Sequence, residues 1–312
     1  LVVLGLGFED RTLESVRRLF SLISAKTAIL VKYAEPGKSK EILEIVGDKV
    51  GDIRVVEYAK TLSEPLHLSK ASALVDVTGL AKPALFAYVR KILRETGAVW
   101  VSHTQAEDYY PLNSAIEEIF SADDDRGGYG LPDGLSRILT GEKPPYSIRE
   151  LINTNADESR CKLLCAFSSA KHQRLLSLLD QREYDRIEIV IPPEGPPRNR
   201  IARIASEIAT LSLQPSGTSV IESDDLEACL EFLCQQYERW YIERGYNVEF
   251  GLTGSKMQAV ACAAISVVCK VAHCWYVCPQ EFDPKRFTNG VGESRYFQIR
   301  RAGFNEELGS LE

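Results

Sequence analysis

The sequence predicts an α/β protein made of two tandem Rossmann-like units, each built around a mostly parallel sheet. Three observations lead to this fold class. Strand-like runs alternate with helix-length amphipathic segments, the alternation restarts after Cys161, and an apolar strand in each half ends in a Thr-Gly pair followed by a lysine. The shared order of elements and the shared marker indicate an internal duplication of one unit.

The first predicted domain covers residues 1–121. Apolar runs of strand length cover residues 1–5, 27–33, 53–58, 73–77 and 98–103. Amphipathic segments of helix length cover residues 11–23, 40–50 and 83–95. Strands and helices that alternate in this way are typical of βα units around a parallel sheet.

The second predicted domain covers residues 161–312. Its predicted strands are residues 162–167, 186–191, 218–222, 247–251 and 273–278. Its predicted helices are residues 171–180, 200–211, 225–244 and 255–271. The stretch 282–299 contains the turn signal Asn289-Gly290, which predicts a loop or a C-terminal hairpin followed by an edge strand.

Between these domains, residues 122–160 are interpreted as a linker or subdomain. The stretch holds three consecutive aspartates, the glycine-rich run 127–134 and the pair Pro144-Pro145. Clusters of this kind interrupt regular structure.

Composition excludes several classes of protein. A length of 312 residues with 45% hydrophobic residues fits two globular domains. No apolar stretch reaches membrane-spanning length and no basic segment precedes one, so we expect a cytoplasmic protein without membrane contact.

A net charge of −7 argues against coating or sequence-specific binding of long nucleic acid. The eight cysteines all lie between Cys161 and Cys278 and are expected to be reduced, without a metal.

The candidate ligand site lies at the carboxyl ends of strands, where open α/β sheets bind their ligands. Glycines allow close backbone approach, hydroxyls donate hydrogen bonds, and a lysine at a helix start supplies positive charge, so these turns could cradle a phosphate. The candidate ligand-binding residues are Gly5, Gly7, Phe8, Glu9, Asp10, Arg11, Thr12, Thr78, Gly79, Lys82, Ser168, Ser169, Lys171, His172, Thr253, Gly254, Ser255 and Lys256.

Each of these features also has a structural interpretation. A Thr-Gly pair can be a turn followed by a helix cap, Arg11 can be a solvated residue at a helix start, and His172 can be a packed side chain. Two nucleotide-binding patterns fail. Lys32 stands where a phosphate loop needs its first glycine, and Asp10 stands where a dinucleotide fingerprint needs its third.

The segment Gly251-Leu-Thr-Gly-Ser-Lys-Met-Gln resembles the Thr-Gly motif of CARF domains, the ligand sensors of CRISPR-linked effectors, and Asp76-Val-Thr-Gly-Leu-Ala-Lys-Pro resembles it again. Two such units in one chain resemble the SAVED arrangement of anti-phage effectors of the CBASS type. Gly251 replaces an aspartate of the family motif, and the first copy lacks its second glycine and its methionine.

The resemblance implies a pseudo-dimer of CARF-like units that binds a cyclic oligonucleotide second messenger and regulates an attached or partner effector in antiviral defence, without another cofactor. It also implies slow cleavage of the ligand as an option, with Lys82, Lys256 and Thr253 as candidates, so whether the chain is an enzyme stays open. Self-association into a homo-oligomer stays open as well.

Two other functions fit parts of the sequence. The turn that holds Gly5 and Gly7, with Glu35 at the end of the second predicted strand, suits an S-adenosylmethionine-dependent methyltransferase. A scaffold subunit of a defence complex with vestigial pockets is the other alternative.

Overall fold

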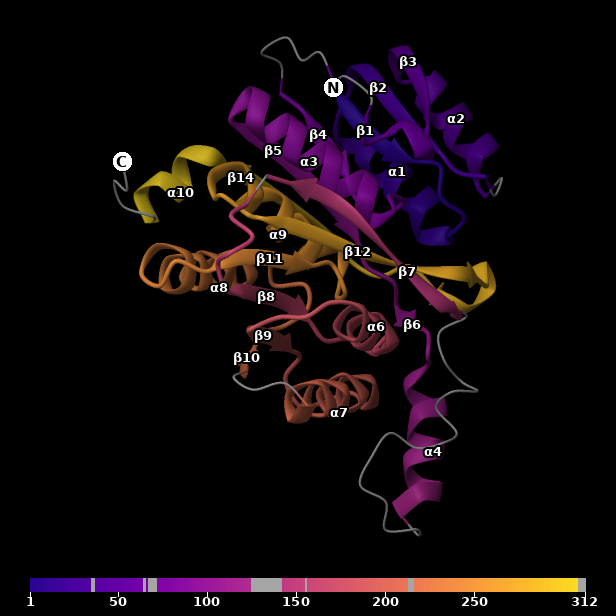
Figure 1. Ribbon diagram of the computed structural model, residues 1–312. Helices are drawn as coiled ribbons and strands as arrows, with labels where there is room; N and C mark the ends of the chain where they lie inside the picture. The colour runs from indigo at the N-terminus through magenta and orange to yellow at the C-terminus, as the bar shows by residue number, and fades with distance from the viewer. Residues whose placement is uncertain are drawn as a thin grey trace. The chain divides into compact units, whose positions relative to one another are not determined.

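The computed structural model describes residues 1–34, 37–63, 66, 72–124, 142–154, 156–212 and 216–307. The chain divides into two compact units (Figure 1). The first consists of Leu1–Tyr109, Ser266–Val268 and Thr288–Glu312, and the second of Tyr110–Ile265 and Cys269–Phe287.

The first unit holds a six-stranded sheet with strand order β14-β5-β4-β1-β2-β3. Its strands are β1 (Val2–Gly5), β2 (Ala25–Lys32), β3 (Val50–Glu57), β4 (Leu74–Asp76), β5 (Ala98–Thr104) and β14 (Ser294–Arg300). Its helices are α1 (Asp10–Leu22), α2 (Ser39–Gly47), the short η1 (Tyr58–Lys60), α3 (Lys82–Thr96) and α10 (Arg301–Glu307). The short strands β6 (Asp108–Tyr109) and β13 (Thr288–Asn289) form a separate antiparallel pair.

The core of the first unit lies between its sheet and the helices α1 and α2. Leu4 of β1 and Leu30 of β2 are buried in one cluster with Val16 of α1 and Ile42 of α2. Val3, which points to the other face of β1, is also buried, as expected for a central strand of a parallel sheet. Because β4 and β5 extend the sheet away from β2, a right-handed crossover places α3 on the face opposite α1.

The second unit holds another six-stranded sheet, with order β10-β9-β8-β11-β12-β7. Its strands are β7 (Glu142–Asn153), β8 (Lys162–Phe167), β9 (Arg186–Ile191), β10 (Ser216–Val220), β11 (Asn247–Gly251) and β12 (His273–Phe282). Its helices are α4 (Asn113–Asp124), α6 (Gln173–Gln181), α7 (Pro197–Ser212), α8 (Leu226–Gln236), η2 (Tyr237–Ile242), α9 (Lys256–Val268) and η3 (Pro284–Arg286).

The two sheets repeat one strand order. In each, five strands run parallel and the sixth pairs antiparallel at one edge, β14 against β5 in the first sheet and β7 against β12 in the second. The strands β1, β2, β3, β4 and β5 therefore correspond to β8, β9, β10, β11 and β12. The predicted fold class, two tandem Rossmann-like units with mostly parallel sheets, is confirmed.

The antiparallel edge strands account for two differences from the predicted boundaries. Residues 142–153, which the sequence analysis assigns to a linker or subdomain, form β7 of the second sheet. The predicted C-terminal hairpin does not form, because β13 pairs with β6 and β14 pairs with β5 of the first sheet. An edge strand is held by a partner far away in the chain, and local sequence does not name that partner. The acidic and glycine-rich residues 125–134 lie outside the described residues.

The two long helices predicted near the C-terminus are present. The predicted helix 225–244 is α8 continued by a π-helical turn, η2, and the predicted helix 255–271 is α9. Six of the eight cysteines are buried, whereas Cys161 is exposed and Cys278 is half-buried. Within the described ranges, no helix combines the length and the apolar character needed to cross a membrane.

Candidate functional site

The four predicted turns lie at the carboxyl ends of adjacent parallel strands. The β1–α1 and β4–α3 turns follow neighbouring strands at the centre of the first sheet, and the β8–α6 and β11–α9 turns do so in the second. At this point the strand order reverses, since β2 and β3 extend to one side of β1 and β4 and β5 to the other. Each pair of turns therefore occupies a topological switch point, where open α/β sheets bind ligands.

In the first unit the two turns contact each other through glycine backbones. A Cβ atom on Gly5 would lie 2.1 Å from the carbonyl oxygen of Gly79, and one on Gly79 would lie 2.5 Å from Cγ2 of Thr12. A Cβ on Gly7 would lie 3.0 Å from Oγ1 of Thr12. These glycines are needed because the two turns approach so closely. The two turns pack directly against each other and leave no room for a side chain between Gly5 and Gly79.

The side chain of Thr78 holds the end of β4 in place through hydrogen bonds. Its Oγ1 donates to the carboxylate of Asp76 at 2.6 Å and accepts from the backbone N–H of Thr104 at 2.9 Å. The hydroxyl of Ser15 lies 3.1 Å away from the same oxygen. All four residues are buried. The hydroxyl of Thr78 is thus engaged within the protein.

Arg11 lies buried beside Glu9, with only 3% of its surface exposed. Its Nη2 donates to both carboxylate oxygens of Glu9 at 3.1 Å, and Nη1 donates to the carbonyl of Thr104 and to the hydroxyl of Tyr109. Burial alone would lower the pKa of Arg11, but the charge and hydrogen bonds of Glu9, together with the charges of Tyr109 and Asp76, outweigh burial and raise the pKa. Arg11 is therefore a buried cation paired with Glu9, and not a solvated residue at a helix start.

Two further predicted residues of the β1–α1 turn, Phe8 and Asp10, are more accessible. Phe8 is half-buried and Asp10 is exposed. The carboxylate of Asp10 pairs with the ammonium group of Lys38 at 2.9 Å, and the backbone N–H of Lys38 donates to the carbonyl of Gly7 at 3.0 Å. The segment before α2 therefore holds this turn from its outer side.

Thr253 has the same structural role in the second unit as Thr78 in the first, with a different partner. Its Oγ1 donates to the carbonyl of Phe167 at 2.6 Å and accepts from the N–H of Phe167 at 3.2 Å. Ser169 donates to the carbonyl of Thr253 at 3.3 Å, and Ser168 donates to the carbonyl of Ala202. The bonds of Thr253 with Phe167 and Ser169 join the two turns, and the bond of Ser168 attaches the β8–α6 turn to α7.

Ser255 and Gln258 form a capping box at the start of α9. The N–H of Gln258 donates to Oγ of Ser255 at 3.1 Å, and the N–H of Ser255 donates to Oε1 of Gln258 at 2.7 Å. Ser255 also donates to the carbonyl of Ser223. A Cβ on Gly254 would lie 1.9 Å from Oε1 of Gln258, so this glycine makes room for the cap. The structural interpretation of Thr-Gly as turn and cap therefore describes much of this motif.

Lys82 and Lys256 occupy equivalent positions. Each is the first residue of the helix that follows the Thr-Gly turn, α3 and α9 respectively, and each is half-buried. The positive end of a helix macrodipole lies at this position, so the two lysines add charge where backbone N–H groups already favour an anion.

A cluster of charges lies at the β8–α6 turn. The carboxylate of Glu142, whose side chain has no exposed surface, accepts from Nζ of Lys171 at 2.8 Å and from Nε of Arg174 at 3.0 Å. Nη2 of Arg174 adds a bond of 2.5 Å. Burial alone would raise the pKa of Glu142, but the two cations outweigh it and hold the pKa at about 2. Glu142 is therefore ionised at neutral pH.

Sequence reasoning identified Lys171 but missed its two partners. Arg174 lies three residues after Lys171, a spacing that places both side chains on one face of a helix. This spacing could have identified Arg174 from the sequence. Glu142 carries no such signal. It lies in the stretch taken for a linker, and only the pairing of β7 with β12 brings it to the turn.

Two buried polar atoms at these turns have no hydrogen-bond partner among the described residues. They are Oγ1 of Thr12, at the β1–α1 turn, and Nδ1 of His172, at the β8–α6 turn. Burial lowers the pKa of His172, so its ring is neutral at pH 7. Polar atoms of this kind are groups that a ligand or a water molecule would satisfy.

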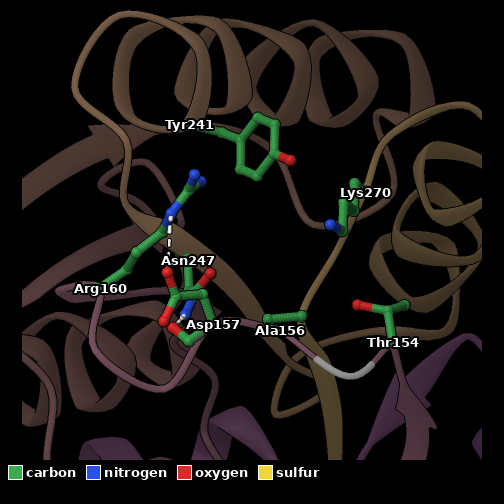
Figure 2. A pocket seen from close by; sticks show the side chains of 8 residues that line it. Thr154, Ala156, Asp157, Arg160, Tyr241, Asn247 and Lys270 are labelled. Atoms are coloured by element: carbon green, nitrogen blue, oxygen red, sulfur yellow. Dashed lines mark hydrogen bonds and ion pairs between the residues drawn. The ribbon is translucent and has the colours of Figure 1, made fainter.

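A small cavity of about 60 Å³ lies at the opposite end of the second sheet. Figure 2 shows Arg160 and Lys270 on either side of the ring of Tyr241 in this cavity. Asn247, at the amino end of β11, donates to the carbonyl of Asp157 at 2.6 Å, and Arg160 pairs with the carboxylate of Asp157 at 3.8 Å. The cavity is therefore separate from the candidate site at the carboxyl ends of the strands.

The chain was compared with known proteins in three ways. A scan against models of protein families finds no match, and neither does a search of curated proteins. Among solved structures, the chain is similar to one described as a Type III CRISPR defence DNA nuclease activated by cyclic oligoadenylate. The TM-score is 0.50 at 12% sequence identity, over 94% of this chain and 67% of the nuclease chain. At this identity the similarity shows a shared fold.

Proposed function

We propose that this chain is a sensor of a cyclic oligonucleotide, of the cyclic oligoadenylate class, in prokaryotic antiviral defence. The observation that carries the proposal is the repeat of one switch-point turn, Thr-Gly followed by a lysine at a helix start, in two units of one fold. The fold is shared with a nuclease that cyclic oligoadenylate activates. A ligand with several phosphates suits several equivalent turns of this kind.

The local charges favour the second unit as the main phosphate-binding half. In the first unit the charge of Arg11 is opposed by two carboxylates, Glu9 and Asp76. In the second unit one carboxylate, Glu142, faces two cations. The strand β11 ends in the uncharged Gly251, whereas the corresponding strand β4 ends in the carboxylate Asp76. A phosphate therefore meets less repulsion at the turns of the second unit, and we assign Lys171 and Lys256 to phosphate contact there.

The role proposed for the chain is regulation of an effector, as an attached domain or as a separate polypeptide in the cytoplasm. The nuclease of similar fold combines its response to cyclic oligoadenylate with DNA cleavage. Within this proposal, binding rather than catalysis is the central activity.

The geometry of the first unit disfavours the methyltransferase alternative. In that reading, Gly5 and Gly7 leave room for the methionine part of the cofactor, but here the backbone of Gly79 lies against Gly5 and close to Gly7. Glu35, the acid proposed to hold the ribose, lies outside the described residues. The glycines serve a contact between turns instead.

The proposal is tested by titration calorimetry of the full chain with cyclic tri-, tetra- and hexa-adenylate. Linear tetra-adenylate, cyclic di-guanylate and S-adenosylmethionine serve as comparison ligands. We expect saturable binding of at least one cyclic oligoadenylate, and weaker binding of its linear counterpart. Binding of S-adenosylmethionine alone would replace the proposal with the methyltransferase alternative, and binding of none of them would favour the scaffold alternative.

A further inference from the structure

Glu142 is the first residue of β7, and its buried carboxylate attaches this end of the strand to the β8–α6 turn. The next three residues, Lys143, Pro144 and Pro145, are exposed. Prolines donate no backbone hydrogen bond to a neighbouring strand. The register between β7 and β12 is irregular here as well, with a shift between Pro279 and Glu281. The ion pairs of Glu142 therefore anchor a strand end whose backbone pairing is irregular, alongside the exposed ion pair of Lys143 with Glu281.

The two cations that hold Glu142 form a geometry suited to an anion with two oxygens. Arg174 donates from Nε and Nη2 to the two carboxylate oxygens, and Lys171 donates to one of them. A phosphodiester also presents two charged oxygens, and a guanidinium group binds both anions in the same bidentate way. Lys171, with 20% of its side chain exposed, is the member of the cluster that reaches solvent.

We propose that Glu142 is a built-in occupant of a phosphate subsite, and that a ligand phosphate replaces it on Lys171 and Arg174 and releases the first residues of β7. The inference rests on the proposed function, because it names the subsite and the regulation of the same ligand site. Lys171 already belongs to the candidate turn, one residue before His172 and two after Ser169.

For an electrostatic reason, the strand is released when a phosphate replaces Glu142, and not when Glu142 withdraws alone. Withdrawal of Glu142 alone would leave two largely buried cations without their counter-ion, which costs much more than breaking an exposed pair. An incoming phosphate supplies a replacement charge as the carboxylate leaves. The state of β7 is thereby linked to the presence of the ligand, and β7 is the strand through which the chain enters the second sheet.

The first test measures the affinity of the full chain for pyrophosphate and for cyclic tetra-adenylate in Glu142→Gln. Without the competing carboxylate, we expect about tenfold tighter binding of pyrophosphate than in the unsubstituted chain. Glu150→Gln is the matched control, since Glu150 is a partly exposed carboxylate of the same strand that pairs with His273. Lys171→Gln added to Glu142→Gln should remove the gain. Equal or weaker pyrophosphate binding by a folded Glu142→Gln variant would overturn the inference.

The two ligands separate this inference from the proposed function. If the unsubstituted chain binds cyclic tetra-adenylate and Glu142→Gln brings no gain for either ligand, the inference fails and the proposed function stands. If Glu142→Gln gains affinity for pyrophosphate but no variant binds a cyclic oligoadenylate, the proposed function fails and the phosphate subsite stands.

A second measurement needs no substitution at Glu142. Hydrogen exchange of the unsubstituted chain is followed with and without saturating pyrophosphate, and compared between residues 143–148 and 149–153 of β7. We expect faster exchange with ligand in the first segment and unchanged exchange in the second. Unchanged or slower exchange in residues 143–148 would contradict the release of the strand, even if Glu142→Gln does not fold.

Discussion

The backbone of Gly5 lies directly against the backbone of Gly79, so the two central turns of the first unit form one compact edge. A side chain on either glycine would overlap atoms of the opposite turn. The contact joins the carboxyl ends of β1 and β4, which lie far apart in sequence, at Gly5 and Asp76. Gly5 and Gly79, which were predicted to help bind a phosphate, are thus needed for the close contact between the two turns at the switch point.

Gly5→Ala is expected to destabilise the protein by about 3 kcal/mol or more, because the new methyl group would lie 2.1 Å from a backbone oxygen that has little freedom to move. Urea unfolding followed by circular dichroism measures this change. Gly47→Ala is the control, since nothing lies within 4 Å of the added Cβ at that helical position. It should be neutral or slightly stabilising. Equal stability of the two variants would show that the turns can separate without cost.

Thr78→Val should cost about 1–3 kcal/mol of stability, because it removes the hydroxyl that links Asp76 and the N–H of Thr104 and leaves buried polar groups unsatisfied. Thr253→Val should have a similar effect through Phe167. Thr218→Val, at an exposed position of the edge strand β10, is the matched control. Thermal unfolding compares the three. A loss of ligand affinity with unchanged stability in Thr253→Val would instead assign that hydroxyl to ligand contact.

The ion pairs of Glu142 should make stability depend on pH in the acidic range. Burial alone would raise the pKa of Glu142, but Arg174 and Lys171 lower it from 4.5 to about 2 in the folded protein. A lowered pKa stabilises the fold above the unfolded value of 4.5, and this stabilisation is lost as pH falls from 4.5 towards 2. The contribution is about 3 kcal/mol at neutral pH.

Urea unfolding of the unsubstituted chain and of Glu142→Gln, between neutral pH and the acid limit of folding, measures this contribution. The difference in free energy of unfolding should be largest at neutral pH and shrink below pH 4.5. A difference that stays constant with pH would show that the ionisation of Glu142 does not account for the effect of the substitution.

The charge difference between the units predicts unequal effects of the two equivalent lysines. Lys256→Gln should weaken binding of a cyclic oligoadenylate by about tenfold, from the loss of a charged hydrogen bond, and Lys82→Gln should weaken it less. Lys270→Gln is the control, because Lys270 lines the cavity at the opposite end of the sheet. Titration calorimetry at one fixed salt concentration compares the three. Equal losses for Lys82 and Lys256 would mean that both units bind phosphate alike.

Local sequence predicted most elements of the fold but not the pairing of the edge strands. Alternating apolar segments located every parallel strand, and most of these strands are buried in the sheet of their own unit, although β3 and β10 at the sheet edges are largely exposed or half-buried. β7 has mostly exposed or half-buried residues, among them Pro144 and Pro145, and no such signal. β14 was predicted as an edge strand, but its partner β5 lies far away in the chain.

For the candidate site, the order of strands and turns in the sequence predicts which turns lie side by side, because the carboxyl ends of adjacent parallel strands lie at one edge of the sheet. It did not determine which side chains at those turns are already engaged. Thr288 donates to Glu9 at 2.6 Å across 279 residues of sequence, and Glu142 reaches Arg174 from another strand. Folding brings such distant groups together, because hydrogen bonds and Coulomb attraction depend on distance in space rather than along the chain.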